Sequence, residues 1–89
     1  MPKTKILLIG AGSVSFGTGT LCDLFAARDH LQGSSIVLVD TNPAALETVA
    51  SVARRLNRAT GEPFTIQATT DRREALPDAA FVIICLLYT

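Results

Sequence analysis

The segment IGAGSVSFG, at residues 9–17, contains the residue types and the spacing of a phosphate-binding turn. Gly10 and Gly12 match the first two glycines of the G-x-G-x-x-G pattern, which allow a tight turn and let the backbone approach a pyrophosphate. The N–H groups at the start of the following helix then hold the negative charge. Ser15 occupies the third glycine position. Since that glycine normally lets the helix approach the sheet closely, we expect looser packing at Ser15, or a phosphate or other polar partner for its hydroxyl.

Asp40 is a second residue whose type and place suit a dinucleotide. It directly follows the apolar run IVLV at residues 36–39, which predicts a buried strand. A carboxylate at this place accepts hydrogen bonds from the adenosine ribose hydroxyls and repels a 2′-phosphate. No arginine follows within the next few residues, so the sequence favours NAD over NADP. The separation from Gly12 exceeds the usual ~20 residues because an additional polar segment precedes the strand. The alternative that stays open is a glycine-rich turn in a domain that binds nothing.

Four short runs predict the strands that carry these residues. Residues 5–9 and 36–39 show no alternation, as in strands covered on both faces of a parallel sheet. Residues 64–69 alternate weakly and predict a third strand nearer a sheet edge, and residues 80–87 predict a fourth that is apolar on both faces. Strands alternating with helices indicate the α/β class, with a Rossmann-like parallel sheet of order 3-2-1-4. We expect this sheet to be truncated after the fourth strand, so that residues 1–89 form the N-terminal half of a dinucleotide-binding domain.

Helical spacing predicts three helices between these strands. The first begins after the glycine-rich turn and ends before a polar segment. The second has Asn42 as its N-cap and Pro43 at its first position, and Gly61 is its expected C-terminal cap. Asp71, with Glu74 three residues later, resembles a capping box that begins a short third helix.

Composition and charge exclude several functional classes. The 89 residues suffice for one small domain, and the formal net charge of +0 disfavours nucleic-acid binding, which needs a basic excess. No apolar run approaches the ~18 residues of a membrane span, and we see no signal peptide. Cys22 and Cys85 lie far apart without a C-x-x-C motif, so we expect two buried, reduced thiols of a cytoplasmic protein and no metal site. His30, alone in a polar segment, is expected to be solvated.

Three segments together resemble a known family. The sequences GAGSVSFGTGTLCDL, IVLVD and TTDRREALPDAAFVI, with their separations, are similar to the N-terminal domain of the NAD-dependent family 4 glycoside hydrolases. The resemblance is greatest to the α-glucosidase/α-galactosidase branch. The shared features are G-A-G-S-x-x-F at residues 10–16, the carboxylate Asp40 and D-R-x-x-A-L at residues 71–76. The resemblance covers residues 5 to about 84.

The resemblance implies which residues bind the cofactor. It assigns the pyrophosphate loop to six positions, the ribose contact to one, and the adenine side to two. These are, in that order, Gly10, Gly12, Ser13, Val14, Ser15 and Phe16; Asp40; and Thr70 and Asp71. Two alternatives remain open: helix capping alone for Thr70 and Asp71, and a place in the core for Phe16.

The resemblance also implies an activity for a longer parent protein. Family members hydrolyse O-glycosidic bonds, here of α-glucosides or α-galactosides, by NAD-dependent oxidation of the sugar, elimination, water addition and reduction. A divalent metal, usually manganese, takes part in the parent. The metal-binding and catalytic residues of the family follow the fourth strand, and Cys85 is not in their context. We therefore expect no catalytic or metal-ligating residue in this chain. For the parent we expect an α-glycoside as the substrate, no nucleic-acid or membrane partner, and a homo-oligomeric state.

Two other functions remain as alternatives. One is the cofactor domain of a lactate/malate-type dehydrogenase, and the other is a non-catalytic nucleotide-binding module. The unpaired outer edge of an apolar fourth strand also predicts that the isolated chain is poorly soluble or self-associates.

Overall fold

The computed structural model describes residues 4–12 and 14–84, with the side chains of residues 14–18 left aside. Strands and helices alternate along the chain. They are β1 (Lys5–Ile9), α1 (Val14–Ala26), α2 (Arg28–Leu31), β2 (Ser35–Val39), α3 (Pro43–Ala59), β3 (Thr65–Thr69), α4 (Arg72–Ala75) and β4 (Phe81–Ile84).

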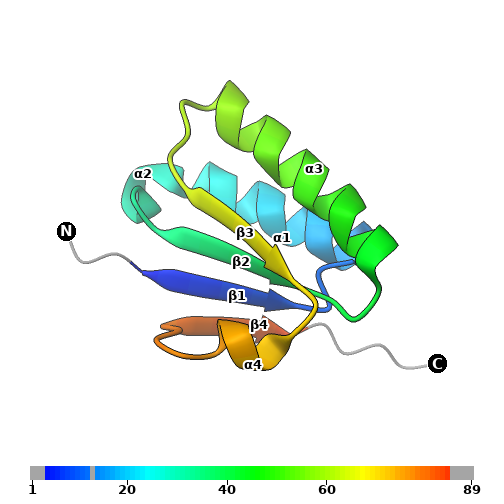
Figure 1. Ribbon diagram of the computed structural model, residues 1–89. Helices are drawn as coiled ribbons and strands as arrows, with labels where there is room; N and C mark the ends of the chain where they lie inside the picture. The colour runs from blue at the N-terminus through cyan, green and yellow to red at the C-terminus, as the bar shows by residue number, and fades with distance from the viewer. Residues whose placement is uncertain (1–3, 13, 85–89) are drawn as a thin grey trace.

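The four strands form one parallel sheet in the order β3-β2-β1-β4, which confirms the predicted fold class and strand order. Helices α1 and α3 lie on one face of the sheet, and α4 lies on the other (Figure 1). All four arrows point the same way, so the loops that follow the strands gather at one edge of the sheet (Figure 1). The glycine-rich turn, Asp40 and the segment before α4 all belong to these loops.

Alternate residues of the central strands enter two separate cores. Leu8 of β1 and Leu38 of β2 pack with Leu21 and Val49 from α1 and α3. Their neighbours Leu7 and Val37 belong to a smaller cluster on the opposite face of the sheet. Because both faces of these strands are covered, the runs carry no polar alternation.

The ends of α3 confirm the predicted caps. The Asn42 side chain accepts hydrogen bonds from the N–H groups of Ala44, at 3.1 Å, and Ala45, at 3.2 Å. At the other end Gly61 has a φ of 87°, in the left-handed region. The N–H of the next residue donates to the Asn57 carbonyl at 2.7 Å, as in a Schellman motif. The caps therefore determine where this helix begins and ends, and so where Asp40 and β3 lie relative to it.

Asn57 is a buried polar residue that sequence analysis did not single out. Its side chain is 8% exposed, donates to the Phe64 carbonyl at 2.8 Å and accepts from the Phe64 N–H at 3.1 Å. The amide thus satisfies both backbone groups of a buried residue just before β3.

Substituting Asn57 with alanine is expected to lower the free energy of unfolding by about 2–3 kcal/mol, because the two buried polar groups of Phe64 lose their partner. Urea denaturation measures this effect. The matched control is Arg58→Ala, at the adjacent exposed position of α3, which should change stability by less than about 0.5 kcal/mol. Equal stability of the two variants would contradict the role of Asn57.

Several details differ from the sequence-based predictions. Cys22 is exposed rather than buried, since it lies on the solvent side of α1; Cys85 lies outside the described residues. The polar segment before β2 contains the short helix α2, and the third strand begins at Thr65 rather than at residue 64. The described part of the fourth strand is Phe81–Ile84.

Strand β4 lies at one edge of the described sheet and is less covered than its apolar sequence suggested. The side chains of Phe81 and Ile84 are 59% and 54% exposed. Self-association of the isolated chain stays a prediction, which sedimentation tests.

In the described part of the chain, no helix is both long enough and apolar enough to cross a bilayer.

Candidate functional site

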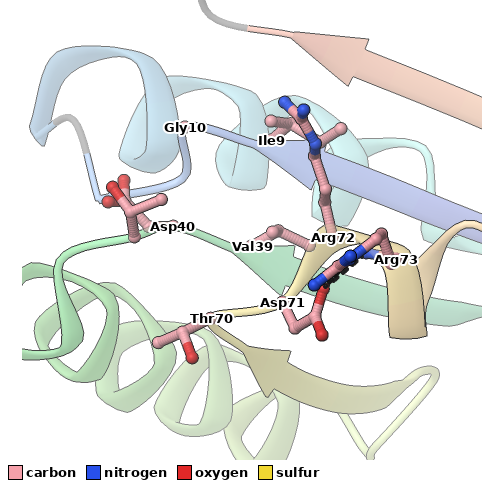
Figure 2. A pocket seen from close by; sticks show the side chains of 9 residues that line it. Ile9, Gly10, Val39, Asp40, Thr70, Asp71, Arg72 and Arg73 are labelled. Carbon is pink, nitrogen blue, oxygen red and sulfur yellow. Dashed lines mark hydrogen bonds and ion pairs between the residues drawn. The ribbon is translucent and has the colours of Figure 1, made fainter.

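A pocket of about 600 Å³ lies where β1, β2 and β3 end (Figure 2). Parallel sheets bind ligands in this place, outside the carboxyl ends of the strands. The pocket is lined by Ile9, Gly10, Val39, Asp40, Thr41, Thr70, Asp71, Arg72 and Arg73. Four of the predicted cofactor-binding residues, Gly10, Asp40, Thr70 and Asp71, therefore lie around one cavity.

The glycine-rich turn crosses the end of β2. Gly10 has a φ of 83°, which confirms the predicted need for glycine at the tight turn. The N–H groups of Gly10 and Ala11 both donate to the Val39 carbonyl, at 2.8 Å and 3.1 Å. These two bonds fold the turn back over β2, so that Gly12 reaches the neighbourhood of Asp40.

Gly12 is in direct contact with Asp40. Its N–H donates to Asp40 Oδ2 at 2.8 Å. A Cβ atom added at Gly12 would lie 2.6 Å from that oxygen and 2.8 Å from the Cβ of Ala45 on α3. Glycine is therefore required here by the protein itself, in addition to the predicted approach of a pyrophosphate.

Asp40 holds two parts of the backbone at once. While Oδ2 accepts from Gly12, Oδ1 accepts from the N–H of Asn42 at 2.9 Å. A carboxylate offers about four acceptor positions, so two remain for ribose hydroxyls. Asp40 thus joins the turn to the start of α3 and can still accept from a ligand. Sequence analysis predicted the ribose contact and missed this structural role.

Asp71 caps α4 and also faces the pocket. Its Oδ1 accepts from the Arg73 N–H at 2.9 Å, which confirms the N-cap. The Asp71 N–H donates to Thr69 Oγ1 at 3.1 Å, so Thr69 fills the place that a capping box gives to Glu74. Asp71 therefore caps α4, and its contact with a cofactor stays a prediction that its place in the pocket allows. Thr70 is exposed at the pocket wall.

Residues 5–88 match the family model described as Family 4 glycosyl hydrolase. The chain belongs to this family. The resemblance drawn from the three segments is thereby confirmed, and the lactate/malate-type dehydrogenase is set aside.

Two curated relatives are similar to this chain in sequence, and one solved structure shares its fold. The chain is 51% identical over 83 residues to an alpha-glucosidase of Erwinia rhapontici, covering 93% of this chain and 18% of that protein. It is 34% identical over 86 residues to an alpha-galactosidase of Rhizobium meliloti (strain 1021), covering 97% of this chain and 17% of that protein. The fold matches a 6-phospho-alpha-glucosidase from gut microorganisms, in complex with NAD and Mn²⁺, with a TM-score of 0.84 and 20% identity over 96% of this chain and 19% of that one. The chain thus spans less than a fifth of each of these three proteins.

In this family 4 chain, two arginines line the same cavity as Asp40. Sequence analysis did not predict these arginines as part of the site. Arg72 and Arg73 come from the segment between β3 and β4, far from Asp40 along the chain. Because the ends of neighbouring parallel strands meet at one edge, the D-R-R triplet just after β3 was a signal that could have placed them here. Because the pocket does contain arginines, the predicted preference for NAD over NADP rests on the Asp40 carboxylate alone. This preference stays a prediction.

The remaining predicted cofactor residues are described only in part. Ser13 lies outside the described residues, as do the side chains of Val14, Ser15 and Phe16. Helix α1 begins at Val14, so the backbone order of strand, glycine turn and helix that the family 4 resemblance implies is present. The expected looser packing at Ser15 stays a prediction.

Proposed function

We propose that this chain forms the adenosine and pyrophosphate side of the NAD site in a family 4 glycosidase. The observation that supports this most is the bond of 2.8 Å between the Gly12 N–H and Asp40 Oδ2. It joins the turn suited to a pyrophosphate to the carboxylate suited to a ribose, beside a pocket at the carboxyl ends of the strands.

The residues fit the adenosine side of such a cofactor. A pocket of about 600 Å³ is in the usual size range for small-molecule sites. Gly10 and Gly12 would border the pyrophosphate, Asp40 would accept from the ribose, and Thr70 and Asp71 would lie near the adenine. The resemblance adds Ser13 and residues 14–16 to the pyrophosphate loop. When bound, NAD supplies a hydride acceptor and donor.

For the parent protein we propose hydrolysis of O-glycosidic bonds in α-glucosides or α-galactosides. Support comes from family membership and from the two curated relatives named as an alpha-glucosidase and an alpha-galactosidase. The NAD-dependent oxidation, elimination, water addition and reduction, and the divalent metal, are carried over from the resemblance. We also propose that the parent is cytoplasmic and homo-oligomeric, and that this chain alone does not catalyse the reaction. The alternative function for this chain is a non-catalytic nucleotide-binding module.

Calorimetric titration of the full-length protein with NAD and NADP tests the cofactor assignment. We expect saturable binding of NAD, and NADP binding weaker by about tenfold or more, because Asp40 repels the 2′-phosphate. An activity assay with p-nitrophenyl α-glucoside and α-galactoside, with and without added NAD and Mn²⁺, tests the reaction. Absence of saturable NAD binding would overturn the proposal.

A further inference from the structure

Two arginines line the pocket, and Arg72 differs from Arg73 in its side-chain contacts. Its neighbour Arg73 lies with Nε 3.5 Å from Asp71 Oδ1. Among the residues that the structure describes, no carboxylate or carbonyl bonds the Arg72 guanidinium, although the side chain lines the pocket and is exposed. Figure 2 shows it extending toward Ile9, while the Arg73 side chain turns back to Asp71.

The side chains of the pocket differ in chemistry from one side to the other. Asp40 lies at one side, next to the glycine turn, and Arg72 lies at the other (Figure 2). Ile9 and Val39, the last residues of β1 and β2, supply the aliphatic part of the lining, although Val39 itself is only 3% exposed. A nucleoside whose ribose contacts Asp40 can therefore place its base, which is bonded directly to that ribose, against this aliphatic lining and on the Arg72 side of the pocket.

We propose that Arg72 is a specificity-determining residue that covers the adenine ring of the dinucleotide. The planar guanidinium stacks on one face of the base, and the partly exposed side chain of Ile9 contacts the other. This inference rests on the proposed NAD site and adds to it the residue that recognises the base. A flat, delocalised cation suits an aromatic ring better than the point charge of a lysine does.

The pyrophosphate is a less favoured partner for Arg72. The turn and the start of α1 that suit the phosphates lie beside Asp40, on the side of the pocket away from Arg72 (Figure 2). A base contact and a phosphate contact also predict different ligand dependence. Removing Arg72 weakens adenosine and NAD by the same factor if the side chain covers the base, and weakens only phosphate-containing ligands if it pairs with a phosphate.

The test uses the full-length protein with Arg72→Ala, Arg72→Lys and the matched control Arg55→Ala. Both alanine variants lose one exposed arginine, but Arg55 lies on α3 and does not line this pocket, so only Arg72→Ala changes the proposed site. The ligands are NAD, ADP and adenosine, with Kd measured by calorimetry or NMR titration at two salt concentrations. Circular dichroism spectra and melting temperatures verify that each variant is folded.

We expect Arg72→Ala to raise the Kd for NAD, ADP and adenosine alike by about three- to tenfold, since a stacked cation at an exposed site contributes modestly. Arg72→Lys should recover only part of this loss, and Arg55→Ala should stay within about twofold of the unsubstituted protein. Equal behaviour of Arg72→Ala and Arg55→Ala overturns the inference. So does a loss seen with ADP and not with adenosine, which assigns Arg72 to a phosphate. If the unsubstituted protein does not bind NAD at all, the proposed function fails first.

Discussion

Replacing Gly12 with alanine is expected to abolish measurable NAD binding and to lower the free energy of unfolding by about 1–3 kcal/mol, the usual cost of overpacking. The added Cβ would lie 2.6 Å from Asp40 Oδ2 and 2.8 Å from the Ala45 Cβ. The carboxylate can rotate away only by giving up its bond to the Gly12 N–H. Ala45 belongs to α3 and moves only with the start of that helix.

Gly19→Ala is the matched control for this substitution. Gly19 lies in α1, and a Cβ added there meets no atom of the described residues within 4 Å apart from its own helix backbone and chain neighbours. The same chemical change should therefore stabilise the protein by about 0.5–1 kcal/mol, because alanine favours the helix over glycine. Urea denaturation and calorimetry with NAD measure both variants. If Gly12→Ala binds NAD as the control does, the close contact at Asp40 does not limit this site.

The second large effect is expected at Asp40. Asp40→Ala removes the acceptor of two backbone N–H groups, those of Gly12 and Asn42, and the proposed ribose acceptor together. We expect about 10- to 100-fold weaker NAD binding, and about 1–2 kcal/mol lower stability because the site is partly open to water. NADP binding should weaken less, since the carboxylate that repels its 2′-phosphate is gone. The NAD/NADP affinity ratio is therefore the decisive measurement.

Two further variants separate the roles of Asp40. Asp40→Asn keeps one acceptor but turns an NH₂ group toward a backbone N–H, so it should also lose stability and affinity. Glu47→Ala removes the same charge from the exposed face of α3, where Glu47 lies 3.5 Å from Arg54, and should change stability by less than about 0.5 kcal/mol. An unchanged NAD/NADP ratio in Asp40→Ala would count against the ribose contact.

Local sequence patterns determined the elements of this protein and their ends. The apolar run of β1 predicted a strand covered on both faces, because successive side chains point to opposite faces of the sheet and each face has its own core. Asn42 and Pro43 determined the start of α3, and Gly61 its end, through hydrogen bonds and backbone angles within a few residues. Such interactions are local, so the sequence alone specifies them.

Only the tertiary structure decided which loops meet. The parallel register places the ends of β1, β2 and β3 side by side, so Gly12 reaches Asp40, and Arg72 lines the same pocket as Asp40 although the two are far apart in the sequence. Asn57 likewise looks like a polar helix residue in the sequence, and its burial follows from the approach of Phe64. The sequence by itself determined the α/β elements and the residue types of a dinucleotide site. The packing of the sheet decided the partners of those residues, because contacts between distant segments depend on how the strands align.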